Sequence, residues 1–302
     1  MDKQHPYPGM EARERYGWWK AYKWLVLRRI CQFGILFLFL LGPWFGLWIV
    51  KGNLASSLTL GVLPLTDPYV LLQSLAAGHW PLATAFLGAL IVLVFYTLVG
   101  GRSYCAWVCP VNMVTDASAC SRRRLGIKGQ GAQISKSFRY WFLGGTLIGA
   151  LVSGSIAWEL INPVSMLHRG IIFGMGTGWF LILGIFLFDL FVSKEGWCGR
   201  ICPVGAFYSL LGKMALIRVA ASRRDQCDDC MDCFAVCPEK QVIPPALKGK
   251  EKGLSPLILD SNCINCGRCI DVCAKDVFRF SLRFDHEQGK SESVQKSMES
   301  LS

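Results

Sequence analysis

The chain has 302 residues, of which 52% are hydrophobic and 11 are tryptophan, and its formal net charge is +11. This apolar share exceeds that of ordinary soluble domains, so the composition predicts a membrane protein. A net charge of +11 would also suit a nucleic-acid-binding protein. Because the basic residues flank apolar stretches, we expect them to orient the chain in a membrane, and we expect no nucleic-acid partner.

Four apolar runs contain no charged residue: residues 30–50, 81–101, 140–158 and 171–188. Each run is close to the ~20 residues that a helix needs to cross a hydrocarbon core of ~30 Å. Backbone groups inside lipid must be paired within the segment, so each run is expected to be a transmembrane helix. The first run is longer than the apolar region of a signal peptide, which favours an uncleaved helix.

Lysine and arginine alternate from one side of these runs to the other. They cluster before the first run, between the second and third, and after the fourth, whereas the two outer loops contain only Lys51 and Arg169. The positive-inside rule then places both termini and the middle loop in the cytoplasm. The sequence therefore predicts a multi-pass protein of the inner (cytoplasmic) membrane.

Each outer loop contains a helix-start signal. Asp67-Pro68 follows Thr66, and either Thr66 or Asp67 would cap a short helix over residues 69–77. Asn162-Pro163 signals a similar start for residues 164–167. A side chain that caps the first turn, followed by proline inside it, is typical of a helix N-terminus.

The membrane part is internally duplicated. Cys105 and Cys109 follow the second run, Cys198 and Cys202 follow the fourth, and both pairs read aromatic-C-x3-C-P-V. Each half is then an outgoing helix, an outer loop, a returning helix and a cysteine motif, which indicates a parallel repeat about an axis along the membrane normal. The four thiols are candidates for a metal site or a redox pair, and close packing of small residues is the alternative.

Two further motifs near the C-terminus contain eight cysteines. Both read C-x2-C-x2-C-x3-C, which is the bacterial ferredoxin signature for two 4Fe–4S clusters, and in such pairs the fourth cysteine of each run ligates the other cluster. Disulfides and structural zinc fit this spacing poorly. We therefore expect cluster 1 on Cys227, Cys230, Cys233 and Cys273, and cluster 2 on Cys263, Cys266, Cys269 and Cys237.

The predicted fold class is an all-α integral membrane domain of four transmembrane helices, built from a duplicated two-helix unit, plus a small α+β ferredoxin domain with two clusters. We expect the membrane domain over residues 1–221, the cytoplasmic ferredoxin domain over 222–284, and a disordered tail over 285–302. The tail is polar, as disordered segments are.

With these features, residues 28–284 resemble the NapH family, the membrane ferredoxin-type subunits linked to periplasmic nitrate reductase. The resemblance implies quinol oxidation, a NapG-like periplasmic ferredoxin-type partner and periplasmic cytochromes downstream. One departure is Ala274, which stands where proline might follow Cys273. Proline is not a cluster ligand, so ligation is unaffected.

Quinol oxidation releases protons, so ionisable residues near the membrane are candidates for a quinol site. His79, His168 and Glu159 belong to the outer loops, and Asp189 follows the fourth run. Lone loop histidines are more often simply solvated, although histidine titrates in the range that a proton acceptor needs.

Two other functions stay open at this stage. The chain could be a membrane anchor or assembly factor for a partner ferredoxin, or a metal reductase in cofactor assembly like the related CcoG proteins. The clusters are expected in the cytoplasm while the implied acceptors are periplasmic, and the sequence contains no C-x2-C-H heme motif to join the two sides. The expected function is nevertheless that of a membrane-bound iron–sulfur electron-transfer subunit.

Overall fold

The computed structural model describes residues 7–284 except 128, 130, 133, 175 and 177, so the predicted disordered tail lies outside the described residues. The chain forms two compact units. Unit 1 combines residues 1–29, 97–103 and 211–302, and unit 2 combines residues 30–96 and 104–210. Within unit 1, whose last segment begins at residue 211, β4 (Ile217–Ala220) pairs with β5 (Arg279–Leu282).

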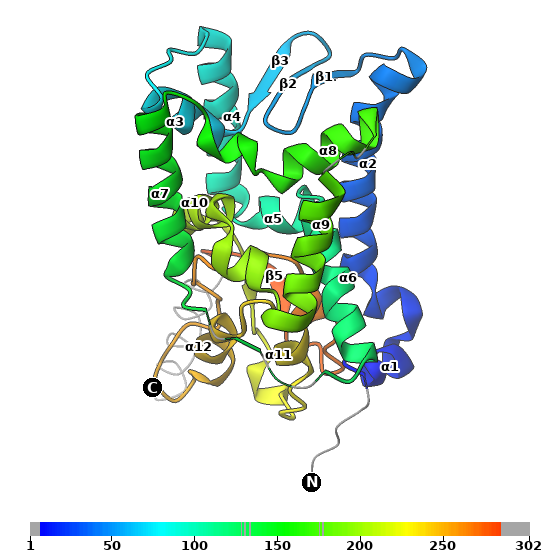
Figure 1. Ribbon diagram of the computed structural model, residues 1–302. Coiled ribbons are helices and arrows are strands. Elements are labelled where there is room, and N and C mark those ends of the chain that lie inside the picture. The colour runs from blue at the N-terminus through cyan, green and yellow to red at the C-terminus, as the bar shows by residue number, and fades with distance from the viewer. Residues whose placement is uncertain are drawn as a thin grey trace. The chain divides into compact units, whose positions relative to one another are not determined.

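Three of the four apolar runs each form one long helix (Figure 1). These are α2 (Lys23–Phe45), which begins in unit 1, α4 (Ala83–Val99) and α7 (Phe138–Ser153). The prediction of a single helix over residues 171–188 was wrong. α8 (Pro163–Phe173) ends inside this run, and a separate helix, α9 (Gly178–Leu187), begins after it. Gly174 has a φ of 93°, a conformation that glycine adopts readily and that a helix cannot contain.

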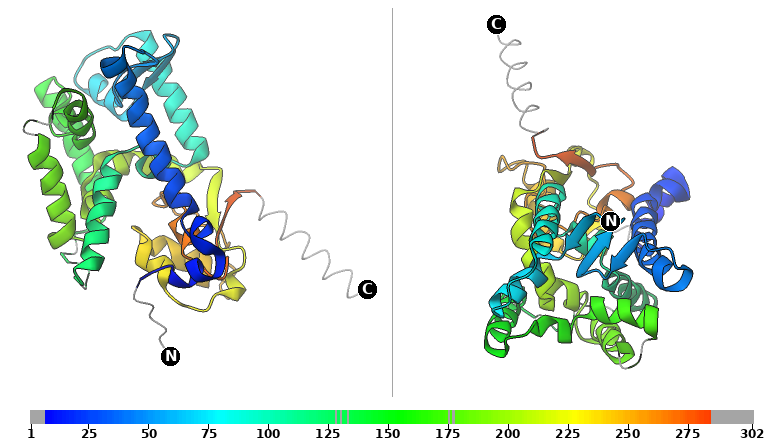
Figure 2. Two further views of the ribbon diagram at one scale, coloured as in Figure 1. Left: turned by 90° about the vertical axis from the view of Figure 1, so that its right-hand side faces the viewer. Right: turned by 90° about the horizontal axis from the view of Figure 1, so that it is seen from above.

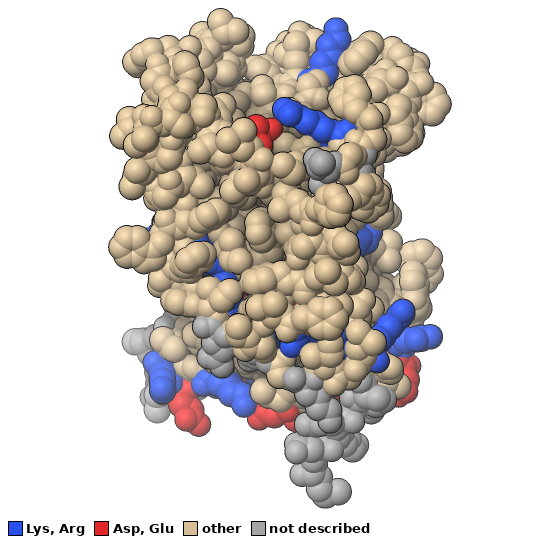
Figure 3. Space-filling model, viewed as in Figure 1, with Lys and Arg blue, Asp and Glu red and all other residues tan. Residues whose placement is uncertain are grey.

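One helical stretch of the described chain, Met10–Phe45, is long and apolar enough to cross a membrane. It consists of α1 (Met10–Ala21) and α2, and Figure 2 shows α2 as a continuous helix. The helices α4 and α7 have 17 and 16 residues, which at 1.5 Å per residue is roughly 25 Å, short of the ~30 Å hydrocarbon core. The face drawn in Figure 3 shows few charged side chains over α7 and α9.

The prediction of an all-α membrane domain was wrong in one respect, because unit 2 also contains a three-stranded antiparallel sheet. Its strands β1 (Val50–Gly52), β2 (Ser56–Thr59) and β3 (Leu63–Thr66) pair in chain order. Leu60 and Gly61, between β2 and β3, have φ values of 53° and 72°, and positive φ at two successive residues is what the tight turns that suit twisted strands require. A local turn therefore folds the outer loop into a sheet.

Both predicted helix starts in the outer loops are confirmed. The Asp67 side chain accepts a hydrogen bond from the backbone N–H of Tyr69 at the start of α3 (Pro68–Ala76). The Asn162 side chain accepts one from Val164 at the start of α8. The second helix runs on to Phe173, well beyond the predicted residue 167. The two halves of unit 2 thus begin their outer helices with the same capping geometry.

The C-x3-C-P motifs lie on short helical turns of unit 2. The first motif occupies α5 (Ser103–Trp107) and the residues after it, and α6 (Val111–Arg124) follows its proline. The second lies on a π-helical turn, Trp197–Ile201, and α10 (Pro203–Leu211) follows. In both halves the proline comes at a helix start, where its missing N–H is not needed.

Unit 1 is an α+β arrangement around an apolar core. Its other helices are α11 (Asp232–Val236), α12 (Ile243–Lys248) and α13 (Arg268–Asp271). Buried residues such as Val219, Ile243 and Phe278 form the core, and several cysteines from each ferredoxin motif belong to it or pack against it. Backbone N–H groups of Trp24 and Leu25 donate to the Asp271 carboxylate at 3.1 and 2.9 Å, which attaches the N-terminal segment.

Candidate iron–sulfur and thiol sites

Two cavities of unit 1 each collect four cysteines. The first cavity is lined by Cys227, Cys230, Cys233 and Cys273. The second is lined by Cys237, Cys263, Cys266 and Cys269. Three cysteines of each motif thus share a cavity with the fourth cysteine of the other motif, which is the grouping that a crossed pair of clusters needs.

The two ferredoxin motifs have the same backbone conformation. Asp229 and Met231 have φ values of 58° and 64°, and Asn265 and Gly267, at the same offsets in the second motif, have φ values of 48° and 72°. Left-handed residues occur in the backbone turns whose N–H groups form the concave anion sites found at many iron–sulfur centres. The loops are therefore shaped to surround a negatively charged group.

The chemistry of these thiols fits iron–sulfur clusters. Burial raises the pKa of Cys233 and of Cys263 to about 12, so thiolates at these positions need a bound metal to be stable near neutral pH. Among residues 7–284, outside the five undescribed positions, no group of three or more His, Cys, Asp or Glu side chains is spaced to hold a single metal ion. A 4Fe–4S cluster instead distributes its four thiolates over four irons.

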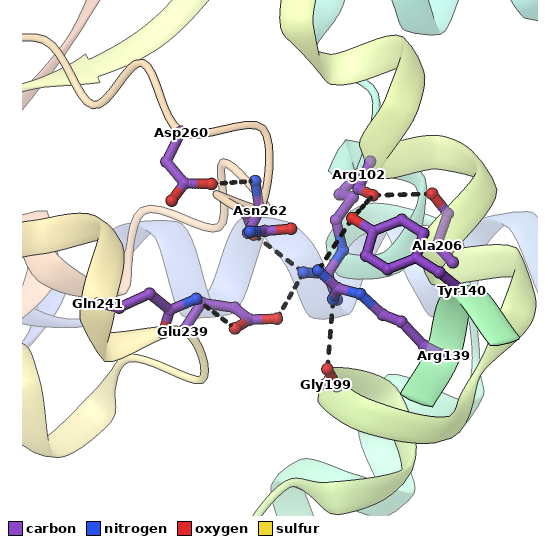
Figure 4. Close-up of polar contacts among 10 residues, drawn as sticks. Arg102, Arg139, Tyr140, Gly199, Ala206, Glu239, Gln241, Asp260 and Asn262 are labelled. Atoms are coloured by element: carbon purple, nitrogen blue, oxygen red, sulfur yellow. Dashed lines mark hydrogen bonds and ion pairs between the residues drawn. The ribbon is translucent and has the colours of Figure 1, made fainter. Parts of the chain in front are cut away.

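A buried ion pair joins the two loops around the second cavity. The Arg102 guanidinium donates to the Glu239 carboxylate at 2.6 Å and to the Asn262 carbonyl at 3.0 Å (Figure 4). Arg102 and Glu239 are each 2% exposed. Since Glu239 comes two residues after Cys237 and Asn262 directly precedes Cys263, the arginine fixes both cysteine-bearing loops. This pair was not predicted from the sequence, where its only local signal is a charged residue close to a cysteine motif.

A second buried arginine lies beside the same cavity. Arg218 is 2% exposed, and its guanidinium donates to the carbonyls of Ala215 and Asp260, at 3.3 and 3.4 Å, and to that of Gly212. Its positive charge acts on Cys263, where it favours the thiolate form. By contrast, carboxylates of Asp228, Asp229 and Asp232 line the first cavity. The two cavities therefore differ in electrostatic environment.

The four C-x3-C-P thiols of unit 2 interact with one another. The pKa of Cys198 is raised well above its usual range, first by burial and then by the like charges of Cys109, Cys202 and Cys105. Burial also raises the pKa of the Cys109 thiol. The Gln32 side chain donates to the carbonyls of Ala106 and Cys109, which ties α2 to the first motif. The duplication thus brings both cysteine pairs within electrostatic range of each other.

Tyrosines next to this thiol layer form a stacked group that the sequence analysis did not identify. The Tyr104 and Tyr208 rings stack at 4.9 Å, and Tyr96 contacts both rings edge-on. The Tyr208 hydroxyl donates to Asp67 at 3.3 Å. Burial raises the pKa of Asp67 to about 6. In the sequence, the feature that points to this tyrosine group is Tyr104, which directly precedes Cys105.

The four predicted quinol candidates all belong to unit 2 and differ in environment. His79 is exposed and its Nε2 lies 3.0 Å from the Gly154 carbonyl, while Glu159 forms an ion pair with Arg169 at 3.6 Å. His168 is 3% exposed and neither ring nitrogen has a hydrogen-bond partner among the described residues. Burial lowers the pKa of His168, which favours its neutral form.

Asp189 differs from the other three because the structure gives it a positioning contact. It is 1% exposed, and its carboxylate accepts a hydrogen bond at 2.9 Å from the backbone N–H of Trp197, the first residue of the second C-x3-C-P turn. The Arg122 guanidinium donates to the adjacent Leu190 carbonyl at 2.6 Å. Asp189 therefore helps to hold the turn that carries Cys198.

Comparisons with known proteins agree with this arrangement. A family described as a 4Fe-4S binding domain matches residues 82–128 and 175–224, and a 4Fe-4S dicluster domain matches residues 226–277. The first description matches once in each half of the repeat, each time over one C-x3-C-P motif. No solved structure matches.

Three curated relatives are similar over nearly their whole length. The ferredoxin-type protein NapH of Haemophilus influenzae is 52% identical over 93% of this chain and 97% of its own. NapH of Escherichia coli is 50% identical over 91% and 95%. The methylamine utilization ferredoxin-type protein MauN of Paracoccus denitrificans is 54% identical over 90% and 95%.

Paired cysteine-lined cavities and two kinds of 4Fe–4S domain define an iron–sulfur electron-transfer protein of the ferredoxin type. Its apolar stretch, Met10–Phe45, is consistent with attachment to a membrane. Identity at this level over this much of the sequence is decisive: the chain belongs to the family of ferredoxin-type proteins that includes NapH and MauN.

Proposed function

We propose that the protein oxidises quinol from the membrane pool and delivers the electrons to a periplasmic nitrate reductase. A NapG-like periplasmic ferredoxin-type partner and periplasmic cytochromes would carry the electrons onward. The observation that supports this most is the pair of cavities, each lined by four cysteines from both ferredoxin motifs. The identity of about half of all residues with NapH proteins supports the nitrate system as the destination.

In this proposal the ligands are those of the crossed pattern. Cluster 1 would be held by Cys227, Cys230, Cys233 and Cys273, and cluster 2 by Cys237, Cys263, Cys266 and Cys269. When bound, two 4Fe–4S clusters supply two one-electron carriers. The protein's own contribution is to fix the loops, through Arg102 and Glu239 at the second cavity.

The proposed setting is the inner membrane, crossed by four helices with the termini and the ferredoxin motifs in the cytoplasm. The basic residues around the apolar runs support this orientation. Exposed apolar side chains on α7 and α9, such as Trp141, Leu151 and Phe180, support lipid contact. The shorter helices would need the bilayer to thin locally or their ends to lie in the interface.

The C-x3-C-P thiols are proposed as a second redox or metal site in the same chain. Their mutual electrostatic influence and their place in both halves of the repeat support a shared role. Such a site would offer electrons a position inside the membrane unit. A second candidate function, metal reduction in cofactor assembly, would need Cys105, Cys109, Cys198 and Cys202 to come closer together, because no such group in the described residues is spaced to hold a single metal ion. Copper binding to these four thiols would support that function.

The destination of the electrons has a second candidate as well. MauN of Paracoccus denitrificans, whose name refers to methylamine utilization, is 54% identical to this chain. The two destinations can be separated by deleting the gene and comparing growth by nitrate respiration with growth on methylamine.

Anaerobic purification followed by iron counting and EPR tests the central proposal. We expect two 4Fe–4S clusters and their reduction on addition of menaquinol or ubiquinol. Zinc or no metal at the eight cysteines would refute the cluster assignment. Clusters that dithionite reduces but neither quinol reduces would refute quinol oxidation and favour the assembly role.

A further inference from the structure

A third cavity of unit 1 adjoins the first cysteine cavity. Its volume is about 360 Å³, within the range of small-molecule sites. Cys273 and Phe278 line both cavities, so they form a shared wall. The rest of the lining includes Tyr16, Lys20, Lys23, Trp24 and Phe280, and we refer to it as the Tyr16 cavity.

The walls of the Tyr16 cavity combine aromatic rings with the cations of Lys20, Lys23 and Arg279 and the carboxylates of Asp271 and Asp276. The Trp24 and Phe280 rings meet edge-on with centroids 4.6 Å apart. The Lys20 ammonium lies 3.9 Å from the centre of the Tyr16 ring, and that of Lys23 lies 5.3 Å from the Trp24 ring. Aromatic faces bind planar rings, and ammonium groups donate to ring oxygens. The cavity therefore suits a planar ring with oxygen substituents.

An apolar path leads along α2 from this cavity. Leu27 and Ile30 follow Trp24 at intervals of three residues and are 39% and 61% exposed. Ile30 lies about 9 Å from Trp24 along the helix axis, and the uncharged part of α2 begins there. A ligand with an apolar tail would place that tail along this exposed row.

We propose that the Tyr16 cavity binds the ring of a membrane quinol, next to Cys273, with the quinol's apolar tail along α2. The inference rests on the proposed quinol oxidation. A quinol that becomes quinone releases two electrons and two protons. The two electrons match the two one-electron carriers expected in unit 1, and the protons pass to water beside the Lys20–Asp276 ion pair, whose side chains are 54% and 37% exposed. None of the four ionisable candidates of the sequence analysis lines this cavity.

Photolabelling of the full-length protein in lipid nanodiscs with an azidonaphthoquinone tests the site. Tyr16→Leu removes an aromatic wall, and Lys23→Trp places bulk in the cavity. Trp19→Leu is the matched control, because Trp19 is also in α1, is 75% exposed and does not line the cavity. We expect the label on the peptide that contains Tyr16 and Trp24. Labelling should fall roughly tenfold or more in Tyr16→Leu and Lys23→Trp but not in Trp19→Leu, because a quinone ring binds poorly where a wall is missing or the space is filled. Dithionite-reduced EPR spectra should stay unchanged in all three.

The outcomes separate this inference from the proposed function. Label on α8 near His168, or label that the two cavity variants do not reduce, would overturn the Tyr16 cavity as the site even if quinol reduces the clusters. Label that maps to the cavity without any reduction by quinol would uphold the binding site and refute quinol oxidation. If a cavity variant loses its EPR signals, its loss of label could reflect damage to the clusters. Tyr16→Phe, which keeps the aromatic ring, is then the deciding variant, and it should retain the label.

Discussion

Replacing Glu239 by glutamine would deprive Arg102 of its carboxylate while leaving both side chains buried. The two groups are 2.6 Å apart and each is 2% exposed. Removing one partner of such a pair costs ~3–5 kcal/mol, because the remaining charge is then buried without compensation. At ~1.4 kcal/mol per tenfold change, this is a factor of roughly a hundred or more in the folding equilibrium.

The Lys250–Asp225 pair provides a matched control within the same unit. Its side chains are 61% and 67% exposed, and exposed pairs contribute at most ~1 kcal/mol. Denaturant unfolding can be monitored under anaerobic conditions by the visible absorbance of the clusters. The unfolding midpoint should therefore fall strongly for Glu239→Gln and little for Asp225→Asn. The double variant Arg102→Met with Glu239→Leu should recover most of the loss, since it removes both charges. Equal shifts for Glu239→Gln and Asp225→Asn would refute the reasoning.

Three further predictions concern the cysteine ligands, a buried arginine and a buried carboxylate. Cys273→Ser should abolish the EPR signal of the cluster held by the first motif and Cys237→Ser that of the other cluster; the reverse result would refute crossed ligation. Arg218→Gln should lower the reduction potential of the cluster next to Cys263, because a buried cation stabilises the more negative reduced state; an EPR redox titration showing no shift would contradict this. The pKa of Asp67 rises from 3.8 to about 6 on burial, so the folded protein holds this proton more tightly than the unfolded chain, and stability falls as pH rises between about 4 and 6. Asp67→Asn keeps a capping side chain and should remove this contribution to the pH dependence of stability, as measured by thermal unfolding at several pH values. An unchanged pH dependence would argue against it.

Features set by local sequence could be predicted. The Asp67-Pro68 and Asn162-Pro163 starts depend on one side chain and the next few backbone groups, and the structure confirms both. The C-x2-C-x2-C-x3-C spacing likewise acts over a short stretch of chain, and each motif has three of its cysteines in the lining of one cavity. Such signals need only a few neighbouring residues to act.

Features that hydropathy and residue spacing do not encode were not predicted. The outer-loop sheet needs three short strands to pair, and none of them has a strong pattern alone. The break at Gly174 interrupts a run that hydropathy treats as uniform. The Arg102–Glu239 pair joins residues 137 positions apart, and no local pattern connects them. Hydropathy thus locates apolar segments without showing where a helix breaks or what a buried charge contacts.

The interleaved composition of unit 1 has a consequence for how the protein is made. Its first 29 residues leave the ribosome well before residues 211–284, with which they share a unit. The Gly9 N–H, for example, donates to Asp232 at 2.8 Å, across 223 positions. The leading segment therefore cannot make these contacts until Asp232 and its neighbours have been synthesised, although most domains mature from the N-terminus onward.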